Sequence, residues 1–154
     1  MELSNLKRDS KMVEGGKWVD EIPGMGNLRL RVRGMSSPTF AALRGRKQRK
    51  VPKSDREADG AIKTDVDMRL LGEALHEAVL LEWDGLTEDG KPVPFDKDLA
   101  LTWLTDPDYM PFADAVVWAA SFVDRSTAEA QGGLEKNSRK PSPGSSSGGT
   151  QQPA

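Results

Sequence analysis

Hydrophobic and polar residues alternate in one early stretch of the chain, which predicts a β-hairpin at residues 17–35. In the segment LRLRV at 28–32, leucine and valine alternate with arginine, the period of two that is typical of a strand with one solvent-facing side. Residues 17–22 can supply the antiparallel partner strand. Because a lone hairpin is only marginally stable in water, we expect Trp18 to anchor it to an apolar layer.

Farther along the chain the spacing changes to three and four residues, which predicts helices. The strongest pattern runs from about residue 65 to 82, and Ser37 and Asp96 are suited to cap two other helices. The predicted helices span about residues 38–49, 65–82, 96–104 and 111–124. In the last one, a stripe that leaves out Trp118 is formed by Phe112, Ala115, Val116, Ala119, Phe122 and Val123.

The two ends of the chain lack such patterns. Residues 1–16 are polar and predict a flexible N-terminal arm, and residues 126–154 are dominated by Gly, Ser, Pro and Gln. A segment of that composition buries too little apolar surface to offset its ordering entropy and predicts a disordered tail. We therefore expect one globular domain at residues 17–125. Its class is α+β, mainly α, with the hairpin packed on a small bundle of three to four helices.

Charge is distributed unevenly. The net charge of the 154 residues is −2, yet residues 1–53 hold 13 Lys/Arg against 5 Asp/Glu, and residues 54–154 hold 9 against 19. Such a bipolar chain is suited to self-association or to a partner of opposite sign, although the basic part can also pack against its own acidic remainder. No apolar run reaches the roughly 20 residues that span a bilayer, so we expect no membrane partner.

The sequence offers little for catalysis. It has no cysteine, which excludes thiolate chemistry and disulfides, and its one histidine, His76, has no second His to complete a metal site. Neither a nucleophile elbow nor a phosphate-binding glycine loop is present. We therefore expect no enzyme, no cofactor and no metal, and a structural or solvated role for His76. A cytosolic hydrolase has no residues to support it.

A basic run at residues 44–50 is the best candidate for binding an anionic partner. Five cations within two helical turns can neutralise phosphates, but no aromatic side chain lies among them to stack on bases. We therefore favour a solvated or acid-facing helix end, or an acidic protein partner, over nucleic acid. The five residues are Arg44, Arg46, Lys47, Arg49 and Lys50.

The segment VLLEWDGLTEDGKPVPF at residues 79–95 predicts a structural joint between two helices. Asp89-Gly90 is a turn dipeptide, and the prolines that follow favour extended backbone. Trp83 at one end and Phe95 at the other can close the turn as a hydrophobic clasp. Trp118, outside its helix's stripe, belongs either to an exposed apolar patch that meets a partner helix or to a second buried face.

Three segments together resemble a tail assembly chaperone of long-tailed (siphovirus-like) bacteriophages. They are GKWVDEIPGMGNLRLRVRGM, LLEWDGLTEDGKPVPFDKDLALTWLTDPDY and FADAVVWAA, and the resemblance covers roughly residues 16–125. It implies a non-enzymatic protein of the infected host's cytoplasm that binds tape measure protein and tail tube protein and is absent from the finished virion. The alternative is a small structural or nucleic-acid-associated phage protein that uses the basic run.

The same resemblance suggests a second, longer product made by a −1 ribosomal slip. Glu135-Lys136-Asn137 can be encoded by GAA-AAA-AAC, which contains a slippery heptamer. We expect this site to follow the last helix, where an extension leaves the core undisturbed. The longer form would share residues 1 to about 137 and add a second domain. A polar tail that happens to contain this common tripeptide is the alternative.

Overall fold

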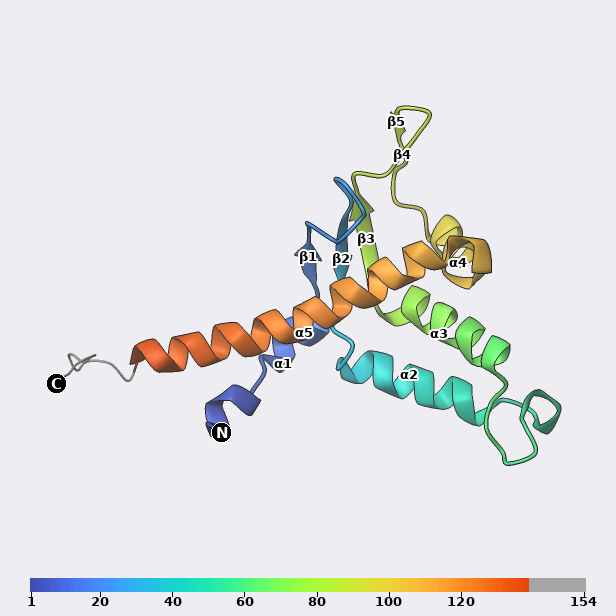
Figure 1. Cartoon of the computed structure of the whole chain (residues 1–154), viewed down its shortest axis with the longest axis horizontal. Helices are drawn as coiled ribbons and strands as arrows, with labels where there is room; N and C mark the ends of the chain where they lie inside the picture. The colour runs from blue at the N-terminus through green and yellow to red at the C-terminus, as the bar shows by residue number, and fades with distance from the viewer. Residues whose placement is uncertain (139–154) are drawn as a thin grey trace.

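The computed structural model describes the backbone of residues 1–138 and the side chains of residues 1–126. The class is α+β, mainly α, as predicted: a small antiparallel sheet packs against helices, and the long helix α5 crosses the molecule (Figure 1). The elements are η1 Leu3–Leu6, α1 Ser10–Gly15, β1 Lys17–Val19, β2 Arg29–Val32, α2 Pro38–Arg49, η2 Lys53–Asp55, α3 Thr64–Ala78, β3 Leu80–Asp84, β4 Thr87–Glu88, β5 Lys91–Pro92, α4 Lys97–Thr105, η3 Pro107–Tyr109 and α5 Met110–Ser138.

The predicted hairpin forms, with β1 antiparallel to β2. Leu30 and Val32 are fully buried, whereas Trp18 is 37% exposed. The expectation that Trp18 anchors the hairpin is wrong, because Trp18 is paired opposite Arg31 and so shares the arginine face of the sheet. Its ring lies 4.9 Å from the guanidinium carbon of Arg29. Val19, one residue later, supplies the buried contact instead.

A third strand, β3, extends the sheet in the order β1-β2-β3. The sequence predicted helix as far as residue 82, but α3 ends at Ala78. The register of β3 on β2 shifts between Arg31 and Val32, and this irregularity lets Leu80 and Trp83 both be buried although they are three residues apart. That spacing is the one a helix would show, which explains the wrong prediction.

The helices begin where the sequence predicts. Ser37 accepts a hydrogen bond from the backbone N–H of Phe40 at the start of α2, and Asp96 accepts two at the start of α4. The buried side of α5 includes five of the six predicted residues, but Phe122 is only partly buried, and Ala120 takes its place in the core. The core thus lies between the sheet, α3, α4 and α5.

The N-terminal segment, predicted to be a flexible arm, carries regular structure and contributes to the core. Asp9 caps α1 by accepting hydrogen bonds from two backbone N–H groups. Val13 is only 2% exposed, and its carbonyl accepts a 2.9 Å hydrogen bond from the N–H of Gly34. The other apolar residues of this stretch, such as Leu3 and Leu6, are exposed and show no regular spacing along the sequence, so the arm was predicted as flexible.

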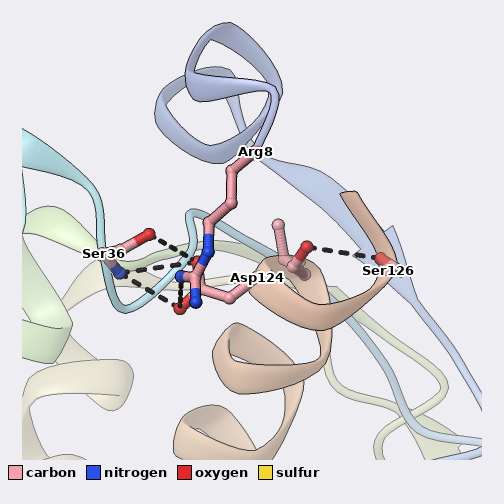
Figure 2. A network of polar contacts seen from close by, with 5 residues as sticks. Arg8, Ser36, Asp124 and Ser126 are labelled. Carbon is pink, nitrogen blue, oxygen red and sulfur yellow. Dashed lines mark hydrogen bonds and ion pairs between the residues drawn. The ribbon is translucent and has the colours of Figure 1, made fainter. Parts of the chain in front are cut away.

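A buried carboxylate, Asp124, ties α5 to the N-terminal half. Figure 2 shows Arg8 and Ser36 converging on it, with Ser36 donating from its backbone N–H at 3.2 Å and its Oγ at 2.8 Å, and Arg8 at 3.7 Å. A Cβ at Gly34 would lie 2.2 Å from Asp124 Oδ1. Residue 34 must therefore be glycine for the carboxylate to fit.

Helix α5 continues to Ser138, beyond the predicted end at residue 124. Positions 135–137, expected to follow the last helix, therefore fall within it, and the ribosomal slip stays a prediction. Of the tail predicted for residues 126–154, residues 139–154 lie outside the described residues.

Candidate partner-binding site

The joint predicted at residues 79–95 is built around Trp83. Its ring lies 4.8 Å from that of Phe95, edge to face, and stacks at 5.1 Å on Trp103 of α4, with Phe112 of α5 at 5.9 Å. The indole N–H donates a 2.8 Å hydrogen bond to the carbonyl of Val93. Because Trp83 is only 3% exposed, this cluster positions α4 and α5 and leaves neither face of the Trp83 ring open to a ligand.

A groove of about 210 Å³ lies where α3, the end of α4, η3 and the first turns of α5 meet. At its base, α3 and α4 approach so closely that a Cβ at Gly72 would be 2.1 Å from the carbonyl oxygen of Leu104. Apolar side chains form most of the walls. They are Met68, Leu71 and Leu75 from α3, Leu104 from α4, and Met110, Ala113 and Val117 from α5.

The charged residues lining this groove are mainly acidic. Asp65, Asp106 and Asp114 contribute carboxylates, against the single cation Arg69. Arg69 already lies 3.8 Å from a carboxylate oxygen of Glu73. One carboxylate oxygen of Asp106 accepts a 2.9 Å hydrogen bond from the backbone N–H of residue 108. The groove is thus apolar within and negative at its edge.

Sequence reasoning missed this groove because its walls come from three separate helices, α3, α4 and α5, whose packing the sequence does not show. One signal was present: Val117 falls outside the stripe that α5 buries. In the structure Val117 is partly buried and lines the groove. An apolar residue beside a complete stripe can mark a second apolar face, but the sequence does not say what lies opposite it.

The basic run of α2 is divided by the fold. Arg44 and Lys47 face α3, where Lys47 Nζ lies 3.0 Å from Glu77 and 3.4 Å from Glu73. The hydrogen bond to Glu77, opposed in part by burial, raises the pKa of Lys47 above its ordinary value. Arg44 pairs with an aspartate of α3 at 3.7 Å. These two cations hold α2 on α3, whereas the three that remain exposed are Arg46, Arg49 and Lys50.

Trp118 lies apart from both the groove and the basic run. It is partly buried, packs against the core and stacks on Phe122 at 5.4 Å. The guanidinium carbon of Arg125 is 5.9 Å from each of these two rings. The structure therefore does not bring Trp118 together with the other predicted binding residues.

Glu14 forms a second polar centre at the start of α2. It accepts hydrogen bonds from the hydroxyls of Ser37 and Thr39, and from the backbone N–H of Thr39 at 3.4 Å. Those hydroxyls, Ser37 first, lower the pKa of the Glu14 carboxyl. These contacts with Ser37 and Thr39 fix the entry of the chain into α2.

His76 joins two helices, since its Nε2 lies 2.9 Å from the carbonyl oxygen of Lys97 at the start of α4. Within residues 1–126, no group of three or more His, Asp or Glu side chains is arranged to hold a metal ion. Among the described helices, none has the length and apolarity that crossing a bilayer requires.

Comparison with known proteins identifies one family. The model of the family described as YdaY prophage protein matches residues 35–137, from just after the sheet's first hairpin to the end of α5. No curated protein and no solved structure matches the chain. The family match covers more than half of the 154 residues. The chain is therefore phage-derived and belongs to the YdaY prophage protein family.

Proposed function

We propose that this protein is a non-enzymatic tail assembly chaperone that binds the tape measure protein and the tail tube protein while the phage tail is built. It would act in the cytoplasm of the infected host and be absent from the finished virion. Membership of a prophage protein family supports the phage setting. The resemblance of residues 16–125 to such chaperones supports the role.

The observation that carries the proposal is the apolar groove between α3, α4 and α5. Near it, Met68 is 45% exposed and Tyr109 45% exposed. Contiguous exposed apolar surface with a polar rim is typical of protein-binding sites, and a groove between helices suits an apolar face of a partner helix. A tape measure protein is long and helical, and it aggregates unless its apolar faces are covered, so it presents the surface that this groove would cover.

Co-expression tests the proposal. The full chain is produced together with a fragment of the tape measure protein from the same phage genome, and the soluble fraction and co-purification of the fragment are measured. We expect the fragment to be soluble and to co-purify with the chain. The control is the same fragment with an unrelated acidic protein of similar size. Equal solubility of the fragment with the chain and with the control protein, and no co-purification of the fragment with the chain, would refute the proposal.

A second candidate rests on the three exposed cations at the end of α2. Arg46, Arg49 and Lys50 are exposed, and exposed cations bind phosphates, which would suit a nucleic-acid-associated role. Retention of duplex DNA that weakens steeply with salt, and that is lost in the variant carrying Arg46→Glu and Arg49→Glu, would favour it. We rank it second because carboxylates of α3 already hold two of the five cations of the run, Arg44 and Lys47, and no aromatic side chain lies within the run to stack on bases.

A further inference from the structure

The chemistry of the groove specifies what it can hold more narrowly than the proposed function does. We propose that it binds an amphipathic helix of a partner protein in which one large apolar side chain is flanked by Lys or Arg. This inference rests on the proposed function, since it names the feature of the partner that the chaperone would recognise. It follows from the size of the groove and from the charge around it.

The size fits one large side chain. A closed apolar cavity of about 150 Å³ takes up benzene, and this groove offers about 210 Å³. Met68 and Met110 form part of its walls, and the flexible side chain of methionine adapts to side chains of different shape. A leucine, methionine or phenylalanine from a helix lying across the groove would therefore be accommodated.

The carboxylates at the edge of the groove determine which residues can flank the apolar side chain of the partner helix. Asp65 lies in the first turn of α3, where a carboxylate also complements the helix dipole. Asp114 lies in the second turn of α5, where the dipole contributes less, and it is exposed. The structure gives the carboxylate of Asp114 no hydrogen bond or ion pair among the described side chains. A lysine or arginine one turn from the apolar anchor would meet it, whereas a glutamate there would be repelled.

Two synthetic helical peptides serve as probes. Both carry phenylalanine at the centre of an otherwise small-residue face; one has lysines on either side of it, and the other has glutamates. Binding to the full chain is measured by fluorescence anisotropy at physiological ionic strength. We expect the lysine peptide to bind and the glutamate peptide to bind at least about tenfold more weakly.

Substitutions in the protein then test whether the peptide binds in the groove. Ala113→Trp fills the groove and should weaken the lysine peptide by about tenfold or more. Its matched control, Ala42→Trp, adds the same ring to an exposed position on α2 and should leave binding unchanged. Asp114→Lys should weaken the lysine peptide by roughly fivefold and improve the glutamate peptide. Glu88→Lys, which makes the same change in net charge on the exposed strand β4, should do neither.

Asp114→Lys and its control Glu88→Lys still test the inference if Ala113→Trp fails to fold, because Asp114 is exposed and its replacement leaves the core intact. Equal binding of both peptides, or no difference between Asp114→Lys and Glu88→Lys, would overturn the inference. So would a concentration-dependent dimer, seen by sedimentation, that Ala113→Trp dissociates, because a second copy would then occupy the groove. If the full chain prefers the lysine peptide but does not bind the tape measure fragment, that result would count against the proposed function alone.

Discussion

The aromatic cluster around Trp83 makes the sharpest prediction about stability. Trp83→Ala removes a ring that is 3% exposed and that contacts three other rings, together with a 2.8 Å hydrogen bond to the carbonyl of Val93. Large-to-small substitutions of buried aromatic residues cost about 3–5 kcal/mol. Three aromatic contacts, each worth about 0.5–1.5 kcal/mol beyond burial, place this one toward the upper end. A domain of this size has only about 5–15 kcal/mol of stability in total.

Urea denaturation followed by circular dichroism measures the effect without relying on tryptophan fluorescence. With a urea dependence of about 2 kcal/mol per molar, a loss of about 4 kcal/mol lowers the midpoint by about 2 M. Trp83→Phe keeps a ring but leaves the Val93 carbonyl without its donor, so it should lose about 1–3 kcal/mol.

Trp18→Ala is the matched control. Trp18 lies on the outer face of the sheet and is 37% exposed, and its contact with Arg29 is worth about 0.5–1 kcal/mol. The urea midpoint of Trp18→Ala should therefore fall much less than that of Trp83→Ala. If the two variants shift the midpoint equally, then Trp83 does not organise the joint, and the burial argument is refuted.

Two further predictions concern backbone fit and pH. Gly72→Ala should destabilise the protein by about 1–3 kcal/mol, because the new Cβ would lie 2.1 Å from the Leu104 carbonyl oxygen. Gly45→Ala, whose Cβ would face only the end of a flexible side chain, should stabilise it by about 0.5–1 kcal/mol. Thermal melts in which the two variants change the melting temperature alike would contradict this. Glu14 has a folded pKa lowered by the Ser37 hydroxyl, so its contribution is present above the ordinary value of 4.5 and is lost as pH falls through the folded pKa. Wild type should thus be more stable than Glu14→Gln at pH 7, with the gap closing below pH 4.5; a gap that stays constant in acid would contradict the assignment.

The elements with a local signal were predictable. Alternation at residues 28–32 predicted β2 and its wet arginine face, and the caps Ser37 and Asp96 predicted where α2 and α4 begin. The pairing of Trp83 with Phe95 was also visible, since a turn dipeptide and two prolines force the chain to reverse between them. Such signals depend only on a residue and its near neighbours.

Elements that depend on distant partners were not predictable. Strand β3 was taken for helix, because Leu80 and Trp83 are three residues apart and only the irregular register on β2 buries both. The burial of Val13 and of Asp124 likewise requires Gly34 and Ser36 to come from another part of the chain. A pattern along the sequence does not contain that information.

The candidate site divides in the same way. The sequence by itself determined that the chain has no thiol, a single histidine, a bipolar charge distribution and a run of five cations on one helix. Only the tertiary structure decided that Lys47 is held by Glu77 while Arg46 stays exposed, and that three helices leave an acid-rimmed groove of about 210 Å³. Composition and local spacing are properties of the chain, whereas a groove exists only where side chains from separate helices fail to fill the space between them.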